Sequence, residues 1–233
     1  MKHSTRLEFT VQNSGTAVVV EPSVVALAAF TGRDQASVKA HLDELSLLGV
    51  EVPKVCPVVY AVTADRVTTA SVVEVLHSET SGELEFAIIL KNGQRYIGVA
   101  SDHTDRRNEK LSIGIAKQLV QRVISREVWR FEDVADHWDQ LVLKSYVMDN
   151  GHRRLYQSST AGHILPVDDL IACVAKQSRK LLDEAIIFSG TVPLLDGVTC
   201  YAPRFEVEMS DPQTDRALRA QYDVVVNDWI AAH

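Results

Sequence analysis

Residues 83–100 read Glu83-Leu84-Glu85-Phe86-Ala87-Ile88-Ile89-Leu90, then Lys91-Asn92-Gly93-Gln94, then Arg95-Tyr96-Ile97-Gly98-Val99-Ala100. Two apolar runs joined by Asn-Gly are a strong short-range indication of a β-hairpin with a two-residue turn. With Asn92-Gly93 as the turn, Lys91 pairs with Gln94. Counting back along both strands then places Glu83 directly opposite Asp102. The hairpin therefore predicts which side chains meet at its open end.

Three carboxylates converge on one face of this predicted hairpin. Glu83 and Glu85 share that face about 7 Å apart, and Asp102 faces Glu83 with Cβ atoms roughly 4.5 to 5.5 Å apart. Opposed like charges need a bound cation, a shared proton or exposure to water. Oxygen ligands without Cys suit Mg²⁺ or Mn²⁺, and Ca²⁺ is also compatible. We expect a divalent-metal site; the alternative is that both glutamates form the solvated face of an edge strand.

A dense polar run follows the second strand, Ser101-Asp102-His103-Thr104-Asp105-Arg106-Arg107. Such density directly behind a strand is typical of a functional site. Asp105 is an alternative metal ligand to Asp102, and His103 is either a ligand or a surface residue. The hairpin register favours Asp102 as the ligand.

The composition narrows the class of protein. The chain has 233 residues, 46% of them hydrophobic, which suits one domain over 1–233 with a strand-rich extension at 1–30 packed on it. A net charge of -7 and the absence of basic runs argue against nucleic acid as a partner. No signal peptide or membrane span is recognisable, so we expect a cytoplasmic protein that does not bind membranes.

The distribution of turn and apolar residues predicts a β-dominated α+β fold. Helical spacing and an Asp34 cap predict a helix at about 35–48 that ends at Gly49, and a second helix covers about 169–175. Strand-like runs are expected at 17–20, 24–28, 57–62, 71–76, 141–147, 185–188 and 204–209. Three cysteines without a CxxC spacing argue against a disulfide framework or a thiolate zinc site.

The stretch Glu83-Leu84-Glu85 resembles the ExE strand of the fumarylacetoacetate hydrolase superfamily, whose next metal ligand is an Asp. Asp102 with Arg106 matches that element. Further segments resemble other elements of the superfamily in the same order, from about residue 30 to 210: Gly32-Arg33 with His41-Leu42-Asp43-Glu44 (HxxE), Asn150-Gly151 (NG), Gln157-Ser158-Ser159-Thr160 (QxxT) and Ser189-Gly190-Thr191-Val192-Pro193 (TGTP).

The chain also departs from the superfamily pattern. Ser37-Val38 replaces the usual Asn-Tyr before the His, Val192 is extra in the TGTP turn, and the Gly-Asp pairs before the last strands are absent. Lys117 matches the superfamily's active-site Lys by its approximate distance after Asp102. More closely, Gly32-Arg33-Asp34, residues 101–106 and His137-Trp138-Asp139 resemble a bacterial offshoot family of uncharacterised proteins.

The resemblance implies a mixed β-roll or sandwich with a few peripheral helices, and a metal-dependent hydrolase or lyase acting on a small oxo-acid. The reaction class covers C–C bond hydrolysis, decarboxylation and hydration through a metal-bound enolate. His41 and Glu44, three apart on one helix, would form a general-base dyad, although a plain surface pair is the alternative. Lys117 would be the third catalytic residue.

The same resemblance implies a substrate-binding set that complements the metal. Its members are Arg33, Arg106, Gln157, Thr160, Ser189, Gly190 and Thr191, with the last three donating backbone amides. Superfamily members are commonly homodimers, and pairing would protect strand edges, so we expect a homodimer. A non-catalytic descendant that binds a small acid or a protein partner is the alternative, because a shared fold does not guarantee function.

Overall fold

The computed structural model describes residues 5–47, 53, 55–149 and 151–228. Its strands are β1 Leu7–Val11, β2 Ala17–Val20, β3 Val24–Ala29, β4 Val58–Ala61, β5 Val67–Thr68, β6 Val72–Val75, β7 Thr80–Ser81, β8 Leu84–Lys91, β9 Gln94–Ser101, β10 Thr104–Asp105, β11 Arg122–Ile124, β12 Glu127–Arg130, β13 Val142–Asp149, β14 His152–Thr160, β15 Ala185–Phe188, β16 Arg204–Asp211 and β17 Arg216–Val226. The helices are α1 Gln35–Leu47, α2 Arg106–Glu109, α3 Ile113–Leu119 and α4 Val167–Gln177, with short 3₁₀ turns η1 Ala64–Arg66, η2 Phe131–Asp133, η3 Ala135–Gln140 and η4 Ala161–His163.

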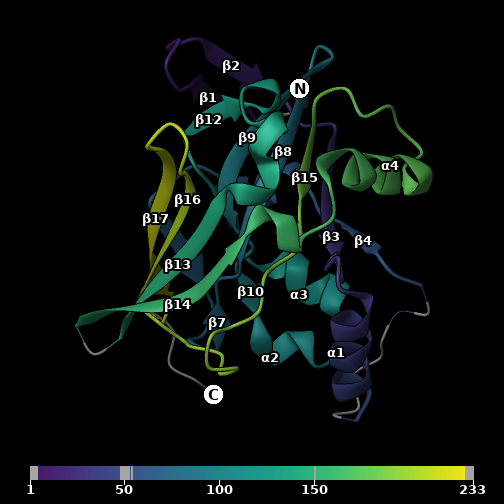
Figure 1. The fold of residues 1–233 in the computed structure, drawn as a ribbon. Helices are drawn as coiled ribbons and strands as arrows, with labels where there is room; N and C mark the ends of the chain where they lie inside the picture. The colour runs from purple at the N-terminus through teal and green to yellow at the C-terminus, as the bar shows by residue number, and fades with distance from the viewer. Residues whose placement is uncertain (1–4, 48–52, 54, 150, 229–233) are drawn as a thin grey trace.

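Two curled sheets form the body of the molecule (Figure 1). The ten-stranded sheet has the order β2-β1-β12-β9-β8-β15-β3-β4, with β11 pairing β9 and β5. The five-stranded sheet has the order β14-β13-β16-β17-β6, and β7 pairs β10 separately. In Figure 1 the β7-β10 pair lies with α2 and α3 at the bottom of the molecule. This β-dominated arrangement confirms the predicted α+β class.

The β8-β9 hairpin has the predicted register. Lys91 pairs with Gln94 and Leu84 with Ser101, around a turn in which Asn92 and Gly93 both adopt positive φ angles. The Asp102 amide donates to the Glu83 carbonyl at 2.9 Å and extends the pairing by one residue. The local turn chemistry therefore places Glu83 opposite Asp102, as expected.

β8 lies in the interior of its sheet, and the edge-strand alternative for Glu83 and Glu85 is wrong. β15 pairs with the side of β8 that β9 leaves free, through Ile187 opposite Ile88. The polar end of the strand is also enclosed: only 2% of Glu85 is exposed to solvent. Buried carboxylates are costly unless they are hydrogen-bonded or paired with charge, so this placement demands a chemical reason.

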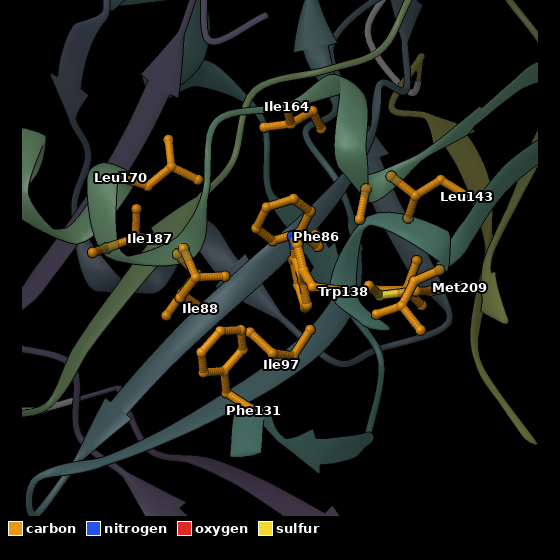
Figure 2. Close-up of a cluster of buried hydrophobic side chains, with 14 of the residues drawn as sticks. Phe86, Ile88, Ile97, Phe131, Trp138, Leu143, Ile164, Leu170, Ile187 and Met209 are labelled. Carbon is orange, nitrogen blue, oxygen red and sulfur yellow. The ribbon is translucent and has the colours of Figure 1, made fainter. Parts of the chain in front are cut away.

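The main core fills the space beside the hairpin (Figure 2). Phe86 and Ile88 from β8 enter one buried cluster, whereas Ala87 and Ile89 enter a second cluster, as strand alternation requires. Phe86 meets Trp138 of η3 edge to face, with ring centroids 4.9 Å apart. Because both faces of β8 are packed, its acidic end is held rigidly.

The helices agree with the sequence in part. α1 begins one residue after Asp34, whose carboxylate accepts from the Ala36 amide at 3.0 Å; the expected stop at Gly49 lies outside the described residues. α4 begins at Val167, two residues before the expected start. The short helices α2 and α3 were not predicted. None of the described helices combines the length and apolar character needed to cross a membrane.

Within the segment expected as an N-terminal extension, β1, β2 and β3 are strands of the large sheet. β1 and β2 lie at one end of the sheet, and β3 lies inside it between β15 and β4. The described cysteines, Cys56, Cys173 and Cys200, are all free, which agrees with the expected lack of a disulfide framework.

Candidate metal centre

The carboxylates of Glu83, Glu85 and Asp102 converge at the open end of the hairpin. One oxygen from each lies within 4.8 Å of the other two. Glu85 and Asp102 are each 2% exposed, and the Glu83 side chain is 18% exposed. The structure thus gathers the three acids that the register placed on one face.

Lys117, on α3, is the first of three basic residues that surround the carboxylates. Its ammonium donates to Glu83 Oε2 at 2.9 Å, to Asp102 Oδ2 at 2.6 Å and to Thr104 Oγ1 at 2.8 Å. Burial lowers the pKa of Lys117, but Asp102 and Glu83 outweigh it and hold that pKa above its ordinary value. The ammonium therefore remains charged inside the protein.

Arg106, at the start of α2, approaches Glu83 from the other side. Its guanidinium lies 3.0 Å from Glu83 Oε1 and 2.8 Å from Glu109 Oε2. Burial alone would lower the pKa of Arg106, but Glu83 and Glu109 outweigh burial and raise this pKa above its ordinary value. Glu83 thus has a cation at each of its oxygens.

Arg122, on β11, is a site residue that the sequence reasoning missed. It is fully buried, and its Nε lies 2.7 Å from Asp102 Oδ1, a charge pair without hydrogen-bond geometry. Its terminal nitrogens donate to the carbonyls of Val120, at 2.9 Å, and Lys117. The available signal was an arginine between the apolar pairs Leu119-Val120 and Val123-Ile124, which needs a charged partner when it is buried.

The electrostatics separate the two glutamates. Burial favours the neutral form of Glu83, but Arg106 and Lys117 outweigh it and lower its pKa to about 2. Burial and the negative charges of Asp102 and Glu83 raise the pKa of Glu85 well above its ordinary value. Among the described residues, the Gly190 amide is the donor to Glu85, at 2.9 Å. Glu85 is therefore the carboxylate without a bonded cation.

The loop after β15 supplies backbone groups to this end of β8. The Ser189 amide donates to the Phe86 carbonyl at 3.0 Å, and the Gly190 amide donates to Glu85. Both were expected to donate to substrate, yet both have acceptors inside the protein. Within the described residues, the Thr191 amide has no acceptor, and the Thr191 hydroxyl donates to the Leu84 carbonyl at 2.9 Å.

Gln157 connects this loop to the hairpin. Its side-chain oxygen accepts from the Leu84 amide at 2.9 Å, and its nitrogen donates to Thr191 Oγ1 at 2.9 Å and to the Val192 carbonyl at 2.6 Å. The side chain is completely buried. In this structure Gln157 thus fixes the position of the carboxylate strand through both ends of its amide.

The two alternative ligands have other partners. Asp105 caps α2 by accepting from the Asn108 amide at 2.9 Å, and it pairs with His77 at 3.0 Å. His103 is fully buried, and its ring nitrogens meet Tyr222 and Thr80, each at 2.9 Å. Burial, followed by nearby arginines, lowers the pKa of His103 to about 3. The surface alternative for His103 is wrong.

Arg33 and Thr160, expected in the substrate-binding set, have other hydrogen-bond partners in the structure. Arg33 makes a bidentate pair with Asp139 at 2.6 and 2.7 Å, and Thr160 contacts His163 at 3.2 Å. The backbone of α1 includes His41 and Glu44, but the side chains of both lie outside the described part of the structure.

The three carboxylates fit a hard divalent cation. Mg²⁺ takes oxygen ligands at about 2.1 Å, so the observed spacing of the oxygens is close to the span of one coordination shell. Among the described residues, Glu85 is bonded by a backbone amide and by no cation, and Asp102 Oδ1 accepts no hydrogen bond. The Lys117 ammonium between Glu83 and Asp102 shows that this position already attracts a cation.

Known proteins resemble this chain at two levels. A family model described as "Protein of unknown function (DUF2848)" matches residues 28–222, and no curated protein sequence matches. Fumarylpyruvate hydrolase from Pseudomonas aeruginosa, solved with Mn²⁺ and pyruvate, is 14% identical, with a TM-score of 0.63 over 97% of this chain and 99% of that one. A 2-keto-3-deoxy-D-arabinonate dehydratase, solved with magnesium and 2,5-dioxopentanoate, is 15% identical, with a TM-score of 0.63 over 94% and 78%.

These two similarities concern the fold. Both proteins have the architecture of the superfamily whose motifs the sequence resembles, so the predicted fumarylacetoacetate hydrolase-like fold is confirmed.

Proposed function

This chain belongs to the DUF2848 family, and from its fold and its three buried carboxylates we propose that it is a divalent-metal-dependent hydrolase or lyase acting on a small oxo-acid. This class comprises C–C bond hydrolysis, decarboxylation and hydration, which all begin by polarising a carbonyl group.

The observation that carries the proposal is the environment of Glu85. This carboxylate is buried beside Glu83 and Asp102, and a backbone amide is its hydrogen-bond donor among the described residues. A protein that needed only stability would gain by replacing such a group with an apolar or amide side chain. A cation that binds Glu85 when the protein is active explains why a carboxylate is present at this buried position.

Two proteins with the same fold support the choice of metal and substrate class. One was solved with Mn²⁺ and pyruvate, and the other with magnesium and 2,5-dioxopentanoate. Each therefore combines a divalent ion with an oxygen-rich, carbonyl-bearing small molecule. We extend this combination to the present chain, with Mg²⁺ or Mn²⁺ as the ion.

Glu83, Glu85 and Asp102 would hold the ion, which would polarise the substrate carbonyl and offset negative charge that develops there. Arg106 and Lys117, both charged in the folded protein, would attract an anionic substrate and balance its carboxylate. The Thr191 amide is available to donate to the same carboxylate. Gly190 and Gln157 would keep Glu85 and β8 in place.

Proton transfer is assigned to α1. His41 and Glu44 are three residues apart on this helix, so they share a face. His41 would take a proton from water while Glu44 orients its ring. His41→Ala should then abolish turnover of a competent substrate while Mn²⁺ affinity stays unchanged. Turnover at the parent rate would exclude the dyad.

The direct test is calorimetric titration of metal-stripped protein with Mg²⁺ and Mn²⁺, beside Glu85→Gln. We expect one ion per chain in the parent and at least a hundredfold weaker binding in the variant, because a neutral amide replaces a charged ligand. Glu206→Gln, which changes a carboxylate in an exposed pair with Arg153, is the matched control. Equal affinity in the parent and in Glu85→Gln would exclude this site. Ion binding that is lost in Glu85→Gln would support the site and justify a screen of oxo-acids as substrates.

A non-catalytic role is the second candidate, and one observation favours it. Lys117, Arg106 and Arg122 already supply three positive charges to the three carboxylates. A protein that had lost its chemistry could keep the fold with this internal balance. Failure of the parent to bind either ion in the titration would support this reading.

We also propose that the protein is a homodimer and acts in the cytoplasm. Size-exclusion chromatography with light scattering distinguishes a dimer from a monomer, and a monomer at micromolar concentration would exclude the first proposal. Cell fractionation of the native host, with detection by an antibody, tests the second.

A further inference from the structure

The ammonium of Lys117 lies between two of the three proposed metal ligands. All its donors are used, on Glu83 Oε2, Asp102 Oδ2 and Thr104 Oγ1, at 2.6 to 2.9 Å. A divalent ion held by one oxygen each of Glu83, Glu85 and Asp102, which lie within 4.8 Å of one another, would bring its charge next to this ammonium. Two cations at contact distance repel strongly, so the ammonium and the ion exclude each other there.

We propose that Lys117 is an internal cation that a divalent ion displaces from Glu83 and Asp102. Ion binding thereby turns the ammonium from a partner of the carboxylates into a group that is free to contact substrate. The inference rests on the proposed metal site. It adds that in this protein the active arrangement of Lys117 forms only after the ion has bound.

The chemistry of the side chains explains why Lys117 is the residue that moves. Its charge is carried on a flexible four-carbon stem, and Thr104 Oγ1 remains available as a neutral partner. Arg122 cannot leave in the same way, because its planar guanidinium donates to the carbonyls of Val120 and Lys117. The Arg122 charge therefore stays beside Asp102 Oδ1, whereas the Lys117 contact with Oδ2 can be given up.

Arg106 provides an internal comparison. It contacts Glu83 through Oε1, whereas Lys117 uses Oε2, and its second carboxylate partner is Glu109. Arg106 thus contacts one proposed ligand, and Lys117 bridges two. Removal of either base takes away one positive charge near the ion, but only removal of Lys117 vacates the position between two ligands.

Two measurements test the displacement. Calorimetric titration with Mn²⁺ compares metal-stripped parent, Lys117→Met and Arg106→Met. We expect Lys117→Met to bind Mn²⁺ at least roughly tenfold more tightly than the parent, because no charged hydrogen bonds must break first. Arg106→Met should gain less. No gain in Lys117→Met, or an equal gain in both variants, would overturn the proposal.

A crystal structure of the parent with Mn²⁺ gives the second readout, and it does not depend on any variant folding. The anomalous signal locates the ion, and we expect Lys117 Nζ beyond hydrogen-bond distance of both Glu83 Oε2 and Asp102 Oδ2. An ion at the carboxylates with Nζ still bonded to both would refute displacement and leave the metal site intact. Absence of Mn²⁺ binding in the parent and both variants would instead remove the proposed metal-dependent function, and the displacement with it.

Discussion

Replacing Gly190 with alanine should weaken both the folded state and the metal site. Gly190 has a φ of +84°, and a Cβ there would lie 2.3 Å from Thr31 Oγ1 and 3.0 Å from the Ala28 carbonyl oxygen. The Thr31 hydroxyl would have to turn away and give up its 2.6 Å hydrogen bond to the Ser189 carbonyl. The Gly190 amide, which donates to Glu85, would shift with the crowded backbone.

The loss of stability follows from three contributions. A left-handed alanine costs about 1 kcal/mol, and a lost buried hydrogen bond costs about 1 kcal/mol more. Crowding against the Ala28 carbonyl in a packed interior adds roughly 1 to 2 kcal/mol. We therefore expect the free energy of unfolding to fall by about 3 to 4 kcal/mol, with weaker Mn²⁺ binding.

Urea denaturation measures the free energy of unfolding, and Gly93→Ala is the matched control. Gly93 also has a positive φ, of +73°, but a Cβ there meets no atom within 4 Å. Its replacement should cost only about 1 kcal/mol and leave Mn²⁺ affinity unchanged. If Gly190→Ala lost no more stability than Gly93→Ala, the packing argument for this loop would be refuted.

Two further substitutions test the buried charges. Burial and like charges raise the pKa of Glu85 above 4.5 in the metal-free folded state, so folding takes up a proton and stability falls as pH rises above about 4.5. The stability advantage of Glu85→Gln over the parent should therefore grow between about pH 5 and about pH 8 in urea denaturation; a constant difference would contradict this. Arg122→Met should destabilise by about 3 kcal/mol or more, because Asp102 loses a buried partner, whereas the exposed Arg153→Met should cost less than about 1 kcal/mol. Equal losses would show that the Arg122 pair contributes little.

The sequence was informative where structure is decided locally. The Asn92-Gly93 turn and strand alternation suffice to place Glu83 opposite Asp102, because turn type fixes hairpin register. The ordered motifs also indicated the superfamily fold. The start of α1 was predictable because the Asp34 cap is formed by neighbours in the chain.

The remaining features depend on distant pairing. β8 is an interior strand because β15, a hundred residues later, pairs with the side that the hairpin leaves open, and the loop after β15 then reaches Glu85 through the Gly190 amide. Lys117 and Arg122 reach the carboxylates through the short elements α3 and β11, which give weak periodic signals. The sequence pattern left His103 open as either a metal ligand or a surface residue. The structure decides this point, because Tyr222 of β17 packs against the ring and contacts its Nδ1 atom.

The bond between Gly190 and Glu85 joins residues 105 positions apart, and this separation bears on when the site forms during folding. Closing so long a loop is slow compared with forming the β8-β9 hairpin, which brings all three acids together locally. While β15 and the loop after it are still being synthesised, the nascent chain has the acidic ligands but lacks the Gly190 amide that donates to Glu85. We therefore expect the divalent ion to select the finished protein and to stabilise it by mass action, rather than to guide the chain toward its fold.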